Sequence, residues 1–71
     1  MTNEDLKAWR TSMGYTQRTA ASALGVALKS YQQLESGKTF GTGTPIAIDQ
    51  RTALACAALA ARLPPWNPAD G

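Results

Sequence analysis

Apolar residues recur at helical spacing in the first part of the chain. Leu6, Trp9 and Met13 lie three or four positions apart, and Thr2 stands where the N-cap of a helix would be. An aspartate three residues after Thr2 completes the spacing of a capping box. We therefore expect a helix over residues 3–13, which a glycine ends.

Two shorter helical patterns follow. Thr16 can cap a helix that runs to Leu24, and Gly25 suits the left-handed position after its last turn. A tight turn begins at Val26, and apolar residues then repeat at intervals of three and four until Gly37. The pattern predicts two short helices separated by a glycine-containing turn.

The second half of the chain is divided between a loop and one long helix. Residues 38–44 have the composition of a loop, in which Phe40 is the only side chain large enough to act as an anchor. Thr44 and Pro45 have the pattern of an N-cap followed by a first-turn proline. They predict a helix over residues 45–63, which two prolines end.

The last helix has no polar face over more than two turns, because every residue from 53 to 61 is apolar. The three preceding helices can cover only one side of it. It is either a core helix of a monomer or a dimerisation helix, and a two-fold dimer would bury its second side. The expected dimer interface consists of Leu54, Ala57, Ala58, Ala61 and Trp66, although Trp66 could equally anchor the C-terminal segment to its own chain.

The chain has 71 residues, one Cys and no His. A lone Cys56 forms no internal disulfide and supplies no zinc site, so oligomerisation is the remaining means of reinforcing so small a domain. The unpaired thiol and an N-terminus without a signal-peptide pattern predict a cytoplasmic protein. We interpret Trp9, Tyr31 and Cys56 as core residues.

The formal net charge is only +2, but the basic residues are unevenly placed. A basic surface attracts nucleic acid or an acidic membrane, and no stretch has the length of a membrane span. The placement therefore favours nucleic acid as the partner. The first half contains Lys7, Arg10, Arg18, Lys29 and Lys38, and its only acid after Asp5 is Glu35.

Residues 16–37, TQRTAASALGVALKSYQQLESG, carry the most specific signal. They resemble, without a gap, the helix-turn-helix of the Cro/cI-like (XRE) family of phage and bacterial regulators. The resemblance implies an all-α, lambda-repressor-like domain of four main helices, with the helix-turn-helix at the second and third. The matching positions are Thr16, Gln17, Ala21, Leu24, Gly25, Val26, Leu34, Glu35 and Gly37, and Leu6, Arg10 and Gly14 fit the first helix of the family.

Physical reasons accompany several of these positions. Ala21 is small where the third helix crosses close to the second, and Val26 and Leu34 are expected to fill the wedge between the two helices. The resemblance also implies an ion pair between Arg10 and Glu35 that ties the first helix to the end of the third.

The resemblance implies that the third helix reads DNA, because an α-helix fits the major groove and its N-terminal half meets base edges. Lys29 can donate to guanine, and Gln32 and Gln33 can pair with adenine. Helix N-termini and polar side chains around them bind phosphates. The expected base contacts are Leu28, Lys29, Gln32 and Gln33, and the expected backbone contacts are Thr16, Gln17, Arg18, Ser36 and Lys38.

Two departures from the family pattern are visible. Ala27 stands where Ser or Thr commonly caps the recognition helix, which removes a cap worth about 1 kcal/mol. After Phe40, one alanine-rich helix takes the place of the last two helices of the phage repressors. This C-terminal part resembles, more loosely, short phage-encoded regulators such as those associated with anti-CRISPR operons.

Together these observations predict a homodimeric repressor that binds a palindromic operator on double-stranded DNA and controls its own gene. The alternative is a protein-interaction module, such as the antitoxin of a toxin–antitoxin pair. An enzyme is not expected, because without a His and with scattered acids no nucleophile–base pair or carboxylate pair can be assembled. No cofactor, metal, membrane or small-molecule effector is expected.

Overall fold

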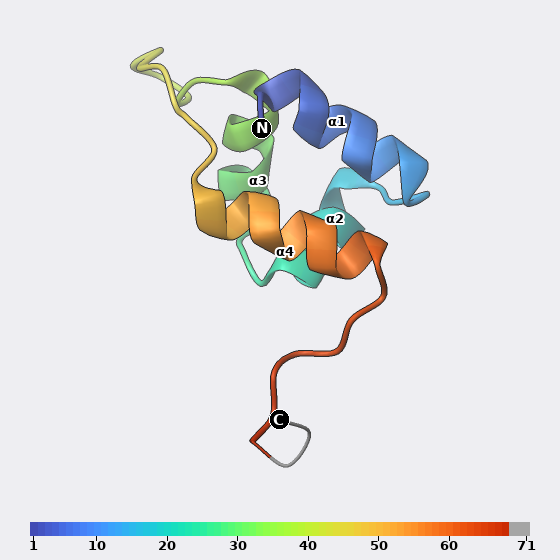
Figure 1. The fold of residues 1–71 in the computed structure, drawn as a ribbon. Helices are drawn as coiled ribbons and strands as arrows, with labels where there is room; N and C mark the ends of the chain where they lie inside the picture. Colours follow the sequence, from blue (N-terminus) through green and yellow to red (C-terminus); the bar gives the residue numbers. More distant parts are fainter. Residues whose placement is uncertain (69–71) are drawn as a thin grey trace.

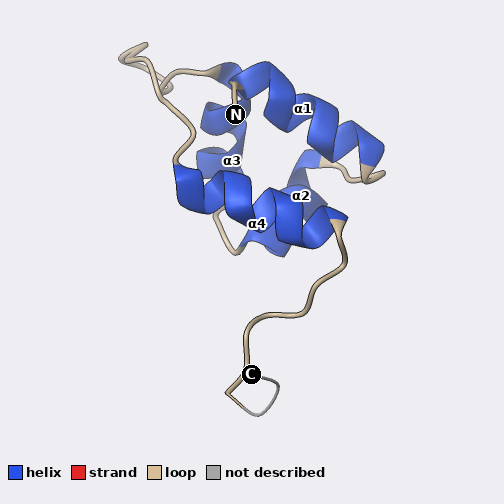
Figure 2. Ribbon diagram, viewed as in Figure 1, coloured by secondary structure: helices blue, strands red, loops and turns tan. Residues whose placement is uncertain are grey.

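The computed structural model describes residues 1–68, and within them the chain forms four α-helices (Figure 2). No strand occurs in this part of the chain, which confirms the all-α fold. Helix α2 contacts both α3 and α4, while α1 contacts α3 (Figure 1). The helices are α1 (Asn3–Ser12), α2 (Gln17–Leu24), α3 (Leu28–Ser36) and α4 (Gln50–Ala60).

Side-chain caps fix where the first two helices begin. The hydroxyl of Thr2 accepts from the backbone N–H of Asp5 at 3.1 Å, and the Asp5 carboxylate accepts from the N–H of Thr2 at 2.9 Å. Thr16 caps α2 by accepting from the N–H of Thr19 at 3.1 Å. The capping box and the second cap predicted from the sequence are therefore present, and the first three helices lie where the pattern placed them.

The core lies where α1, α2, α3 and α4 meet. Leu6 and Tyr31 are fully buried, Cys56 is almost so, and Trp9 is buried beside them. The indole N–H of Trp9 donates to the backbone carbonyl of Cys56 at 3.0 Å, which ties α1 to α4. Trp9, Tyr31 and Cys56 are thus core residues, as predicted, and burial raises the pKa of the Cys56 thiol.

The fourth helix is shorter than the predicted span of residues 45–63, which is wrong at both ends. It begins at Gln50, because Asp49 is the N-cap and accepts from the N–H of Thr52 at 2.8 Å. It ends at Ala60, followed by Arg62 with a positive φ of 57°. The all-apolar run of residues 53–61 therefore makes up most of the helix.

Residues before Asp49 pair with the end of α3 instead of opening a helix. Lys38 and Pro45 form an isolated antiparallel bridge, and the N–H of Ile46 donates to the carbonyl of Gly37 at 2.9 Å. This pairing holds Pro45 in an extended segment, so the Thr44–Pro45 pattern does not start the helix. Ile48 packs against the core and carries the chain from this segment to the N-cap of α4.

Two apolar side chains do not lie where the sequence placed them, and a third, Trp66, for which the sequence left two roles open, lies on the surface. Phe40 is 46% exposed and does not anchor its loop, which is held by polar hydrogen bonds instead. Val26 is 38% exposed, so of Val26 and Leu34, which were expected to fill the wedge between the helices, only Leu34 packs against the core. Trp66 is 79% exposed on a segment that extends away from the helices (Figure 1), so it does not anchor that segment to its own chain.

Candidate nucleic-acid interface

Helices α2 and α3 are joined by a turn of three residues, 25–27. Gly25 adopts the left-handed conformation with φ 73°, which a residue with a side chain adopts only at a cost. The N–H of Val26 then donates to the carbonyl of Ala21 at 2.9 Å. Ala21 is buried, as expected where two helices approach closely. The sequence thus builds a compact helix-turn-helix.

An ion pair fixes the end of α3 to α1. The Arg10 guanidinium contacts both carboxylate oxygens of Glu35, Nε to Oε2 at 2.6 Å and Nη2 to Oε1 at 3.3 Å, and it also donates to the carbonyl of Tyr15. The two side chains are only 19% and 6% exposed. Burial opposes ionisation of Glu35, but hydrogen bonds, the strongest from Arg10, hold the pKa of its carboxyl below the usual value.

A chain of hydrogen bonds runs from this ion pair to the exposed face of α3. The Gln17 amide donates to Oε1 of Glu35 at 3.4 Å, and the Gln32 amide donates to Oε1 of Gln17 at 3.3 Å. Gln17 comes from the first turn of α2 and Gln32 from the middle of α3. The side chains of Gln17 and Gln32 are therefore held in place by the protein itself, before any ligand is present.

Gln33 has a structural partner in the following loop. Its Oε1 accepts from the backbone N–H of Phe40 at 2.8 Å, and the N–H of Thr39 donates to the carbonyl of Thr44 at 2.8 Å. Ser36 is also engaged, because its hydroxyl donates to the carbonyls of Gln33 and Lys38. Replacing Gln33 would therefore disturb this loop as well as any base contact.

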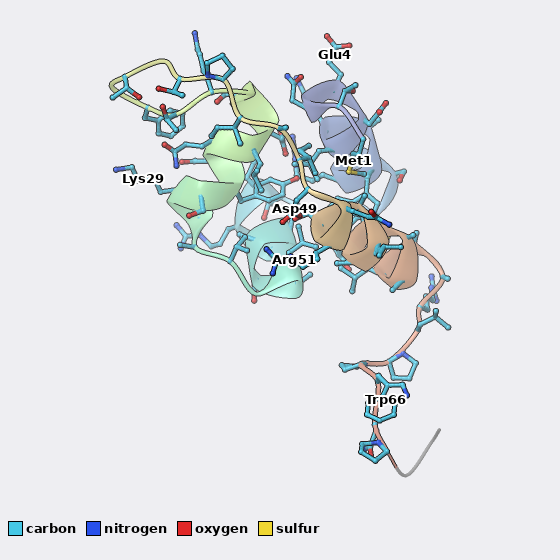
Figure 3. All side chains as sticks on the ribbon, turned by 60° about the vertical axis from the view of Figure 1, so that its left-hand side comes forward. Met1, Glu4, Lys29, Asp49, Arg51 and Trp66 are labelled. Atoms are coloured by element: carbon cyan, nitrogen blue, oxygen red, sulfur yellow. The ribbon has the colours of Figure 1, made fainter. Side chains whose placement is uncertain are left out.

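Three exposed cations come from α2, from α3 and from the residues after α3. Arg18, Lys29 and Lys38 are all exposed, and Lys29 projects from α3 into solvent, away from α4 (Figure 3). The only acid within α2 and α3, Glu35, is paired with Arg10. Apart from this pair, α2, α3 and residues 38–40 carry only positive charges, which suits an anionic partner.

The remaining residues proposed from the sequence differ in how accessible their side chains are to a ligand. Leu28 is partly buried, whereas the hydroxyl of Thr16 is occupied by the N-cap of α2. Lys7 and Phe40 did not stand out as interface residues in the sequence. They border a hollow of about 420 Å³ together with Gln17 and Gln32. Lys7 could have been recognised, because it lies one helical turn before Arg10.

The recognition helix α3 begins without a side-chain cap, because its N-cap residue is Ala27. We expect Ala27→Ser to raise the free energy of unfolding by about 1 kcal/mol, since a serine oxygen can accept from an N–H of the first turn. The measurement is thermal unfolding followed by circular dichroism. Thr16→Ala is the matched control at α2, where the same measurement should show a loss of similar size. An unchanged Ala27→Ser protein would show that the first turn of α3 gains nothing from a cap.

Comparison with protein families supports this description. A helix-turn-helix family model matches residues 6–40, the segment that contains α1, α2 and α3. No curated protein and no solved structure matches the chain. Within the described residues no helix is long and apolar enough to cross a membrane, and no cluster of three or more His, Cys, Asp or Glu side chains could hold a metal. Residues 6–40 are thus a DNA-binding helix-turn-helix of the Cro/cI-like (XRE) type.

Proposed function

We propose that this helix-turn-helix protein is a homodimeric repressor that binds a palindromic operator. The observation that carries the proposal is the preorganised, positive face of α3, on which Lys29 is exposed and Gln32 is held in place through Gln17. Side chains that are ordered before binding lose less conformational freedom when they meet DNA. This arrangement favours base reading over a loose electrostatic contact.

Base reading is assigned to residues in the first two turns of α3. Lys29 would donate to guanine O6 or N7, and Leu28 would meet a thymine methyl group. Gln33 keeps its amide N–H groups for a base, because its Oε1 is used by Phe40. The assigned base contacts are Leu28, Lys29, Gln32 and Gln33.

Backbone contacts are assigned to the ends of α2 and α3. The free N–H groups at the start of α2 and the Gln17 side chain suit one phosphate, and Arg18 and Lys38 suit others. The hydroxyls of Thr16 and Ser36 already have partners within the chain, so their share in DNA binding would come from a second hydrogen bond. These contacts would fix the register of the protein on the duplex.

Dimer formation is assigned to α4 and the segment after it. Leu54 is 60% exposed, and Ala57 and Ala61 are exposed on the same helix and its cap. A two-fold pair would place two recognition helices about 34 Å apart, in successive major grooves. The protein would then repress by covering a promoter. Footprinting on the DNA upstream of its own gene tests this, and a protected palindrome is the expected result.

Reading and positioning can be separated by mutation. Lys29→Ala is expected to cost about 1–3 kcal/mol on the operator and little on random DNA, because only a base contact distinguishes sequences. Lys38→Ala is the matched control, a second exposed lysine whose loss should weaken both complexes alike and reduce the slope of log affinity against log salt by about 1. The measurement is fluorescence anisotropy on both DNAs over a salt series. Equal losses on both DNAs for Lys29→Ala would assign Lys29 to the backbone.

A further inference from the structure

The segment after α4 forms an arm, residues 61–68, that projects from the helical body (Figures 1 and 3). Trp66 near its end is 79% exposed, although tryptophan is highly buried on average. Pro64 and Pro65 precede it and stiffen the arm, since proline fixes its own φ and restricts the residue before it. The chain therefore holds a large aromatic side chain away from its own core.

An apolar hollow of about 210 Å³ lies at the base of this arm, where α2 and α4 meet. It is smaller than the roughly 300–1,000 Å³ of sites that bind small molecules. No charged residue borders it, so its size and chemistry suit one apolar side chain. Its lining residues on the helices are Ala23, Leu24, Ala55, Ala58 and Leu59, and arm residues 63–65 close one side.

We propose that two copies of the chain exchange arms, so that Trp66 of each copy enters the α2–α4 hollow of the other. This inference rests on the homodimer of the proposed function and names the segments that form it. A two-fold axis brings the same arm and the same hollow together twice, so each contact made is made again. The stiff arm loses little conformational freedom on docking, which favours such an exchange.

Charge and area favour a second copy as the occupant. Arg62 is the only charged residue between positions 52 and 68, so two copies that exchange arms would bury no unpaired carboxylate from this segment. Each indole contributes up to about 150–250 Å², and with Leu54, Leu63 and the prolines of both copies the total approaches the roughly 1,000 Å² of a specific interface. The described residues contain neither a disulfide nor a metal cluster, so a partner subunit is the reinforcement left to so small a domain.

Trp66→Ala is expected to raise the dimer dissociation constant at least about tenfold, as the loss of a central aromatic anchor does. Analytical ultracentrifugation over a concentration series measures it. Phe40→Ala removes another exposed aromatic, on the loop after α3, and should leave the constant unchanged. A wild-type chain that stays monomeric up to the highest concentration of the series, about 100 µM, would overturn the exchange. A Trp66→Ala chain that dimerises as strongly as the wild type would overturn it as well.

Cross-linking tests the exchange by a second route. One chain carries Ala23→Cys, and a second chain, with a tag of different length, carries Pro68→Cys. The two are mixed and oxidised. A disulfide between the two chains is expected, because the arm of one copy would lie over α2 of the other. Ala8→Cys on α1 replaces Ala23→Cys in the control mixture, which should give no such product. Absence of the mixed disulfide overturns the inference. If the mixed disulfide is absent but DNA binding remains salt-dependent, the arm exchange is wrong and the DNA-binding function stands. If the chain dimerises but does not bind DNA, the proposed function is wrong and the arm exchange stands.

Discussion

Arg10→Ala is expected to lower the free energy of unfolding by about 3 kcal/mol, because it leaves the nearly buried Glu35 carboxylate without its cation. For a domain of this size the melting temperature would fall by about 12–24 °C. Glu35→Ala should cost less, since Arg10 is the more exposed partner and keeps its bond to the carbonyl of Tyr15. The double variant should cost less than the sum of the two, because removing one partner already removes the interaction.

The pH dependence gives an independent check on the same pair. In the wild type the pKa of Glu35 is lowered by folding, so its contribution is present above the unfolded pKa and is lost as the pH falls through the folded one. Without Arg10, burial acts to raise the pKa, which would make the variant gain stability as the pH falls. The difference in stability between the two proteins should therefore narrow from pH 7 towards about pH 4. Additive single losses and a constant difference would show that the two residues are not coupled.

Ala58→Glu is expected to give a folded monomer whose operator affinity is reduced at least about 100-fold, because the second recognition helix no longer binds as part of the same molecule. Ala58 is partly buried on α4 and borders the hollow at the base of the arm. A carboxylate there would have to be buried without a cation in a dimer, whereas a monomer leaves it in water. Light scattering and anisotropy on the operator measure the two effects.

Ala47→Glu is the matched control for charge, since Ala47 is exposed in the segment before α4. It should stay dimeric and bind the operator nearly as the wild type does. Binding to random DNA by the Ala58→Glu monomer should persist, because its phosphate contacts are intact. A dimeric Ala58→Glu protein would remove α4 from the interface, as would equal losses of operator binding in both variants. Glutamate substitutions at the exposed Ala57 and Ala61 offer the same test on an adjacent face of the helix.

The sequence was sufficient for those parts of the fold that local chemistry decides. Thr2 and Thr16 cap helices because their hydroxyls lie within a few residues of the N–H groups they accept from. Gly25 ends α2 for a similarly local reason, its tolerance of a positive φ. The ion pair of Arg10 with Glu35 joins residues far apart in the chain, and only the resemblance to a known family pointed to it.

Long-range pairing explains where the sequence was insufficient. Thr44 and Pro45 satisfy a local helix-start pattern, but this segment pairs with residues 37 and 38, and Asp49 supplies the cap instead. The role of Gln33 in holding the loop was invisible for the same reason, because its partner is a backbone N–H seven residues away. Hydrophobicity alone placed Phe40 inside, whereas polar bonds of the loop left it on the surface.

The bond between Trp9 and Cys56 bears on how this domain could be transplanted. The segment that matches the family ends at residue 40, yet α4 lies beyond it and supplies both the carbonyl that accepts from the Trp9 indole and the buried Cys56 side chain. A chimera built from residues 6–40 would expose Trp9 to water and leave its N–H without this acceptor. Grafts that are meant to keep the recognition helix in its native orientation should therefore carry residues 2–61 as one unit, so that α4 travels with the surface it supports.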